Sequence, residues 1–235
     1  MRTAIILVMF TASLAHAGWK DYETEREVSL DAAGLSGIEI KAGAGSLEVN
    51  GVSGGDQILV RAIIQVPDAS EDKALEIIEK EMVLELQTND DIAVLDGYFD
   101  SSGWGDSPSM RLEVSVPERF SMDIEDSSGS IVVNDVTGNI KVDDSSGSIK
   151  MSHVGGTVSI EDGSGSINID GVGGDVTLED GSGSIKLSDV NGSVTIDDGS
   201  GSITIRDVAE DLIIIDDGSG SINYSNVQGT VQNES

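Results

Sequence analysis

The sequence predicts an all-β fold, a parallel β-helix (β-solenoid) built from coils of about 18 residues. The first observation behind this is a repeat of Gly-Ser-Ile, whose glycines follow one another at steps of 18, 18, 18, 18 and 19 residues: Gly129, Gly147, Gly165, Gly183, Gly201 and Gly220. A short fixed period indicates one supersecondary unit stacked on copies of itself. The second is alternation inside each unit, as in Ile185 and Leu187 or Val194 and Ile196, which is the period of a strand with one buried face.

Stacked coils explain the repeat better than a hairpin meander does. One unit buries too few aliphatic side chains to offset the entropy of ordering its backbone, so no unit can fold alone. Coils stacked in register satisfy each other's backbone hydrogen bonds, whereas a meander has no reason to keep one sequence at one phase. We expect the solenoid to be right-handed, because parallel crossovers strongly favour that hand.

The first residues predict export. Residues 1–17 carry one Arg, an apolar stretch and a small-x-small ending at Ala15 to Ala17, the pattern of a cleaved signal peptide. No later apolar run approaches the roughly 20 residues of a membrane span, and the chain has no Cys for a lipid anchor or a disulfide. We therefore expect an exported protein of the bacterial periplasm or cell surface, with no transmembrane segment.

Residues 18–120 are predicted to form an irregular N-terminal part of the same solenoid, with a helix-bearing cap, and residues 121–235 the regular repeats. The segment 44–52 copies one repeat unit. A helix is expected from about Ser70 to Met82, with Ser70 as its N-cap and Ala74, Leu75, Ile78 and Met82 on its apolar face. Further strands are expected at 38–40, 58–66, 83–87, 92–95 and 110–116. Such a cap would protect the open edge of the first coil from pairing with other chains.

Composition excludes several functions. Asp and Glu number 43 against 13 Lys and Arg, a net charge of −30, which repels nucleic acid and bare anionic membranes or lipopolysaccharide. Beyond the leader, His153 is the one histidine, and it falls in a turn. Without Cys, and with one such His, most nucleophile–base pairs and His-rich metal sites are excluded. We expect no catalytic residues and no enzymatic activity.

The acidic pairs before each Gly-Ser-Ile are the one group of residues in the sequence whose arrangement suggests a binding site. Three interpretations stay open. The second acid of each pair can cap backbone N–H groups in an Asx-turn, and we favour this interpretation. The stacked acids can instead bind calcium, or simply face solvent. The candidate calcium ladder comprises Asp126, Asp144, Asp162, Asp180, Asp198 and Asp217. Caps on ionised carboxylates would lower their pKa values and make stability fall in acid.

The order of motifs along the chain resembles the bacterial putative adhesin family, β-strand-repeat proteins with a domain of unknown function. The leader, the Gly-Ser-Leu-Glu-Val segment at 45–49, the interrupting helix, Val-Pro-Glu-Arg-Phe-Ser at 116–121 and the runs of Ser-Gly-Ser-Ile carry this resemblance. It covers roughly residues 22–231. The resemblance implies a β-solenoid, an envelope location and an adhesive or scaffold role, and it brings no catalytic residues.

Two functions therefore stay open. The first is a non-enzymatic, adhesin-like or scaffold module that contacts an envelope protein or polysaccharide, without nucleic acid, and works as a monomer or an end-to-end oligomer. Its mixed, non-repulsive contact face would carry Lys150, Asn168, Lys186, Thr204 and Asn223. The alternative is a calcium-responsive domain that uses the acidic ladder. No cofactor other than calcium is expected.

Overall fold

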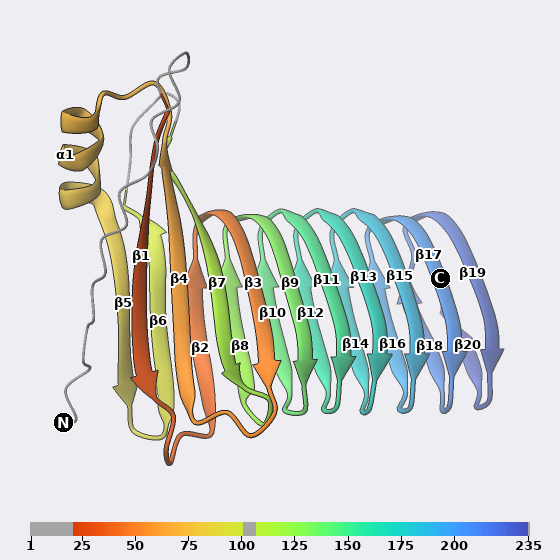
Figure 1. Ribbon diagram of the computed structural model, residues 1–235. Coiled ribbons are helices and arrows are strands. Elements are labelled where there is room, and N and C mark those ends of the chain that lie inside the picture. Colours follow the sequence, from red (N-terminus) through yellow and green to blue (C-terminus); the bar gives the residue numbers. More distant parts are fainter. Residues whose placement is uncertain (1–20, 101–106, 235) are drawn as a thin grey trace.

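The computed structural model describes residues 21–100 and 107–234, which form two ten-stranded β-sheets facing each other along one solenoid axis (Figure 1). The predicted leader, residues 1–17, lies outside the described residues. One helix, α1 (Glu71–Glu81), accompanies the strands. The predicted all-β solenoid of about 18-residue coils is confirmed.

The first sheet, sheet A, joins its strands in the order β1 (Tyr22–Asp31), β4 (Gln57–Val66), β7 (Ser109–Pro117), β3 (Ala44–Val52), β9 (Ser128–Val136), β11 (Gly147–Val154), β13 (Gly165–Val172), β15 (Gly183–Val190), β17 (Ser200–Val208) and β19 (Ser219–Val227). The opposite sheet, sheet B, runs β20 (Val231–Asn233), β18 (Leu212–Asp216), β16 (Val194–Asp198), β14 (Val176–Asp180), β12 (Val158–Asp162), β10 (Ile140–Asp144), β8 (Ser121–Asp126), β2 (Gly37–Ala42), β6 (Ile92–Phe99) and β5 (Met82–Asn89). Each regular coil contributes one strand to each sheet.

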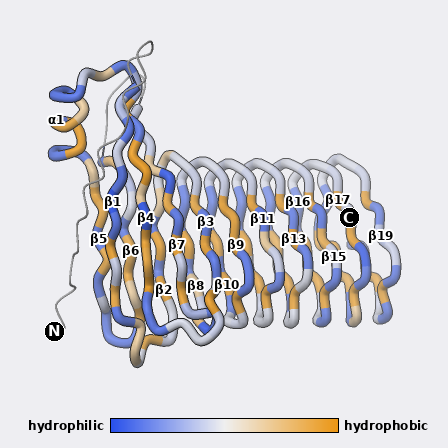
Figure 2. The backbone as a smooth tube through the Cα atoms, viewed as in Figure 1, coloured by the Kyte–Doolittle hydropathy of each residue, from blue (hydrophilic) through white to orange (hydrophobic). Residues whose placement is uncertain are grey.

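Neighbouring coils stack in register, so equivalent residues lie side by side. Gly165 pairs with Gly183 and Ile167 with Ile185 in parallel strands β13 and β15. Ile185 and Leu187 are 1% exposed, whereas Lys186 between them faces solvent. Figure 2 shows this alternation along the strands. The inward residues of both sheets form one continuous aliphatic core, as the period of two predicts.

Along the first part of the chain, stacking order differs from sequence order. Strand β2 lies between β6 and β8, and β3 lies between β7 and β9. The coil β6–β7 therefore packs on the outer side of the earlier coil β2–β3, and the chain then continues from the other side. Beyond it, β1, β4 and β5 pair antiparallel with their neighbours. The sequence pattern does not indicate strand β1, because its outward residues are mostly glutamates and its inward side holds few aliphatic residues.

The helix begins after Ser70, whose Oγ accepts a hydrogen bond from the N–H of Lys73 at 3.4 Å, as the N-cap prediction requires. Ala74 and Ile78 are buried, but Leu75 is 40% exposed. The prediction of Leu75 on the buried face is wrong because the helix lies at the end of the molecule beside β5, where only a narrow stripe is covered (Figure 1).

Candidate functional site

Each coil turns from sheet B to sheet A at a corner that holds the acidic pairs, here called the acidic corner. The second acid of five successive pairs is 6% exposed or less, and we call these residues the aspartate column: Asp126, Asp144, Asp162, Asp180 and Asp198. The first member of each pair faces solvent. The pairs thus contribute one buried column and one exposed column, because successive strand residues point to opposite faces.

One carboxylate oxygen of each column residue caps the turn. The Oδ1 atom of Asp180 accepts a hydrogen bond from the N–H of Ser182 at 3.0 Å, and Asp144, Asp162 and Asp198 each make the same i to i+2 bond. Asp126 accepts instead from the N–H of Ser127 at 2.9 Å. The Asx-turn interpretation is confirmed for Asp144, Asp162, Asp180 and Asp198, whereas Asp126 bonds to the adjacent N–H. Each Oδ2 atom is buried and lacks a hydrogen-bond partner in the part of the chain that the structure describes.

Burial controls the titration of the column. Loss of solvation is the largest influence and raises the pKa of Asp126 to about 7 and that of Asp162 to about 6; neighbouring carboxylates add to the rise, and the turn N–H groups oppose it. Burial also raises the pKa of Asp144, Asp180 and Asp198. The prediction that caps would lower these pKa values is wrong, because one hydrogen bond per carboxylate does not compensate for its desolvation.

The last coil departs from the column. Its 19-residue step inserts Ile215 as a bulge, so that Asp216 pairs with Asp197. Here Oδ1 of the exposed Asp216 accepts a hydrogen bond from the turn N–H of Gly218 at 2.9 Å. Asp217, the sixth residue of the predicted ladder, is half-buried and does not make this cap. The sequence signal for this change of capping residue is the extra residue in the 19-residue step from Gly201 to Gly220.

The acidic corner does not present a calcium cage. A shallow groove of about 670 Å³ follows it, lined on its rim by the exposed acids Asp143, Glu161, Glu179 and Asp197. Calcium takes six to eight oxygens, but among the described residues no three His, Cys, Asp or Glu side chains converge to hold a metal. A calcium response of the ladder stays a prediction.

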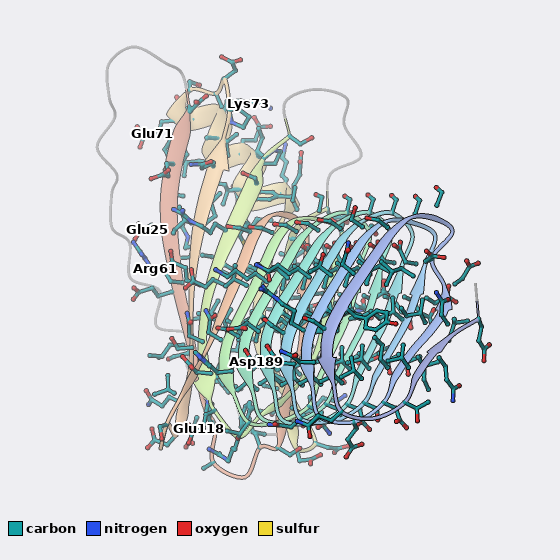
Figure 3. All side chains as sticks on the ribbon, turned by 90° about the vertical axis from the view of Figure 1, so that its right-hand side faces the viewer. Glu25, Arg61, Glu71, Lys73, Glu118 and Asp189 are labelled. Carbon is teal, nitrogen blue, oxygen red and sulfur yellow. The ribbon has the colours of Figure 1, made fainter. Side chains whose placement is uncertain are left out.

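The opposite corner, from sheet A to sheet B, is built differently. Its turn residue has a left-handed backbone, with φ between 56° and 59°, in Asp135, His153, Asp189, Asp207 and Asn226. These side chains point outward, and His153 Nδ1 lies 3.0 Å from Oδ1 of Asp135. His153 is thus the exposed turn residue that the sequence predicts. Figure 3 shows Asp189 on the outside of the stacked coils. A second groove, of about 770 Å³, follows this corner.

The outer surface of sheet A over β11–β19 is here called face A. The parallel register places the five predicted contact residues in one row along it, Lys150, Asn168, Lys186, Thr204 and Asn223. A serine row and a mixed polar row flank it. The three rows carry three bases and one acid, and two further exposed acids, Asp189 and Asp207, lie at the adjoining corner, whereas the whole chain has about three acids per base. The charge of this side of the molecule is therefore close to balanced, unlike that of the whole chain.

Five bases elsewhere take part in ion pairs, Lys41, Arg61, Lys73, Lys80 and Arg111, whereas within the described residues Lys141 and Arg119 do not. Arg61 contacts Glu25 and, at 3.0 Å, Glu113 on the antiparallel strands, where Figure 3 shows Arg61 beside Glu25. Lys41 pairs with Glu125 at 3.0 Å. Helix residues Lys73 and Lys80 pair with Glu76. In residues 21–100 and 107–234, no ion pair includes the bases of face A, Lys150, Lys186 and Arg206.

Comparisons with known proteins found similarity only among solved structures. No family model and no curated protein matches the chain. A putative cell adhesion protein from Clostridium sporogenes is 15% identical over 90% of this chain and 99% of its own, with a TM-score of 0.37. A putative adhesin from Bacteroides fragilis is 13% identical over 89% and 96%, with a TM-score of 0.40. A putative lipid binding protein from Parabacteroides distasonis is 13% identical over 89% and 94%, with a TM-score of 0.41. At these values the similarity concerns general shape and carries no function across.

The described helix cannot cross a membrane. It has 11 residues, and no helix in the described ranges is long and apolar enough to do so.

Proposed function

We propose that the protein is a non-enzymatic, exported, adhesin-like module that uses face A to contact another macromolecule of the bacterial envelope. The observation that carries this proposal is the regularity of face A, where outward residues recur in register over five coils with no break in the parallel sheet. A rigid, flat surface of this kind suits contact with an extended partner. Catalytic clusters, by contrast, interrupt a repeat with residues that occur once.

The charges support the choice of face. The outward side of sheet B carries the exposed acids Asp143, Glu161, Glu179 and Asp197 at one coil spacing, about 4.8 Å apart. Such a row repels the anionic surfaces common in bacterial envelopes. Face A does not, because its neutral residues and three bases leave no like-charge barrier.

Steric blocking of one face tests this proposal. The chain has no Cys, so Ser184→Cys on face A and Thr177→Cys on the outer side of sheet B can each be coupled specifically to a bulky maleimide polymer. Co-sedimentation with isolated envelopes of the source bacterium should be abolished by the polymer at position 184 and retained with the polymer at position 177. Equal binding by both conjugates would refute face A as the contact surface.

A further inference from the structure

We infer that the partner of face A is an anionic polysaccharide, whose acidic groups pair with Lys150, Lys186 and Arg206 while its hydroxyl groups meet the serine and asparagine rows. This inference rests on the proposed function of face A and names the chemical class of its partner. Three features of the face carry it: its shape and polarity, the state of its bases, and their spacing.

The composition of face A argues against a protein, a single-stranded nucleic acid or a neutral sugar as its partner. Stable protein interfaces need desolvated aromatic or aliphatic anchors, and they are poor in Lys and Ser. Over β11–β19 the outward residues of the three rows include hydroxyl groups, amides and charges but no aromatic or aliphatic side chain. Single-stranded nucleic acid needs aromatic platforms for its bases. Neutral sugars likewise pack their ring faces on aromatic side chains, so the face fits a polymer held by charge and hydrogen bonds.

The bases of face A are free to bind anions. All three are exposed and take part in no ion pair among the described residues, unlike Arg61 or Lys41. The one acid of the three rows, Asp170, accepts a hydrogen bond from Oγ of Ser188 at 2.6 Å. An arriving carboxylate or sulfate can therefore form charge-assisted hydrogen bonds without displacing an internal partner.

The stacking sets the spacing of these bases. Lys150 and Lys186 lie in one row, two coil steps apart, or about 9.6 Å. Arg206 follows one coil beyond Lys186, in the neighbouring row. A polymer with regularly repeated acidic groups can meet several of these bases at once, which raises its overall affinity without a strong single contact.

The acids on the outer side of sheet B do not cancel this attraction at physiological salt, whereas Asp189 and Asp207, at the corner beside face A, lie within a Debye length and offset part of it. The Debye length is about 8 Å at 0.15 M ionic strength, and the two sheets alone are separated by about 10 Å. The acids on the outer side of sheet B are thus largely screened from a ligand on face A, although they would slow its approach at low salt.

Binding to polygalacturonate, with neutral dextran as the matched control, tests the inference by affinity electrophoresis and calorimetry. The full chain should bind polygalacturonate and not dextran. The variant Lys150→Glu/Lys186→Glu/Arg206→Glu should lose about tenfold or more in affinity. The equally charged Lys73→Glu/Lys80→Glu/Lys141→Glu should stay within about twofold, and circular dichroism should show that both variants remain folded.

Each result is decisive for one of the two claims. Equal affinity for dextran, no binding to polygalacturonate, or an equal loss in both triple variants would overturn the anionic polysaccharide as the partner. Face A would still be the contact surface if the maleimide polymer coupled at position 184, but not the one coupled at position 177, blocked binding to envelopes.

Discussion

The two corners of each coil perform the same turn with opposite arrangements of polar groups. At the acidic corner a carboxylate points inward, binds a turn N–H, and precedes a glycine with φ between 128° and 157° in the regular coils 129–201. At the opposite corner an Asp, His or Asn takes φ near 57° and points into solvent. The inward carboxylate and the glycine of the acidic corner are therefore constrained, whereas the left-handed residue of the opposite corner has a side chain that is free to vary.

Two positions of a repeat can therefore be equally regular in sequence for different physical reasons. The acidic corner repeats because buried groups tolerate few alternatives. The opposite corner repeats because Asp, Asn and Gly all accept a left-handed backbone. The two corners should differ accordingly in their sensitivity to mutation and to pH.

The largest effect is expected from Gly183→Ala at the acidic corner. Gly183 has φ of 152°, and a Cβ atom there would overlap the carbonyl oxygen of Gly165 in the coil before. Because that backbone is held in the sheet, the variant should lose more than about 4 kcal/mol of unfolding free energy, measured by urea denaturation.

The matched control is Gly171→Asn at the opposite corner. Gly171 has φ of 78°, and the nearest atom to an added Cβ is the backbone nitrogen of His153 at 3.7 Å. Asn should cost less than about 1 kcal/mol, since equivalent coils carry Asp or Asn here. Similar losses in Gly183→Ala and Gly171→Asn would contradict the contrast between the corners.

The next effect is a dependence of stability on pH that originates at the acidic corner. Burial raises the pKa of Asp162 to about 6, above the value near 3.9 of an unfolded Asp, so the folded state binds more protons between these values. Its stabilising effect is complete below about pH 4 and is lost as the pH rises through 6; for Asp126 the loss extends to about pH 7. Unfolding measurements should therefore show higher stability at pH 5 than at pH 8, by roughly 1 kcal/mol for Asp162 and roughly 3 kcal/mol for Asp126, since each pKa unit above pH 5 corresponds to about 1.4 kcal/mol.

Asp162→Asn isolates this contribution. The amide keeps an oxygen to cap the turn but carries no charge, so the variant should be more stable than the parent at about pH 8 and less dependent on pH. Glu161→Gln removes an exposed charge one residue away and should change the pH profile much less. A parent protein that loses stability between pH 7 and pH 5 would show that the caps outweigh burial after all.

A smaller effect is expected for Asp189→Ala at the opposite corner. Alanine lacks the short polar side chain that stabilises a left-handed residue, so the cost should be about 1 kcal/mol. Asp189→Asn should be close to neutral. Chemical denaturation of both variants, compared with the parent, measures the difference, and a loss above about 3 kcal/mol in Asp189→Ala would mean that this corner is as constrained as the other.

The smallest effect is expected from calcium. The column offers no converging oxygen cage among the described residues, so about 5 mM calcium should raise the melting temperature only slightly beyond sodium chloride of equal ionic strength. A rise of ten degrees, reversed by a chelator, would instead identify the acidic corner as a metal site.

The sequence by itself determined the repeating part of the molecule. The 18-residue step, the strand alternation around Ile185, the turn residues and the Ser70 N-cap each depend on neighbours within a few positions, and the structure shows all of them. Stacking then followed, because identical units satisfy one another's backbone hydrogen bonds only when aligned. The row of predicted contact residues on face A is a direct consequence of that alignment.

Tertiary structure alone decided what depends on distant neighbours. It placed the coil β6–β7 outside β2–β3, left Leu75 exposed, moved the last cap from Asp217 to Asp216, and turned the aspartate column into the interior. The sign of the column's pKa shifts follows from that last choice, because desolvation depends on everything packed around a carboxylate. Local sequence reports which groups can bond to nearby backbone, whereas burial is a property of the assembled coils.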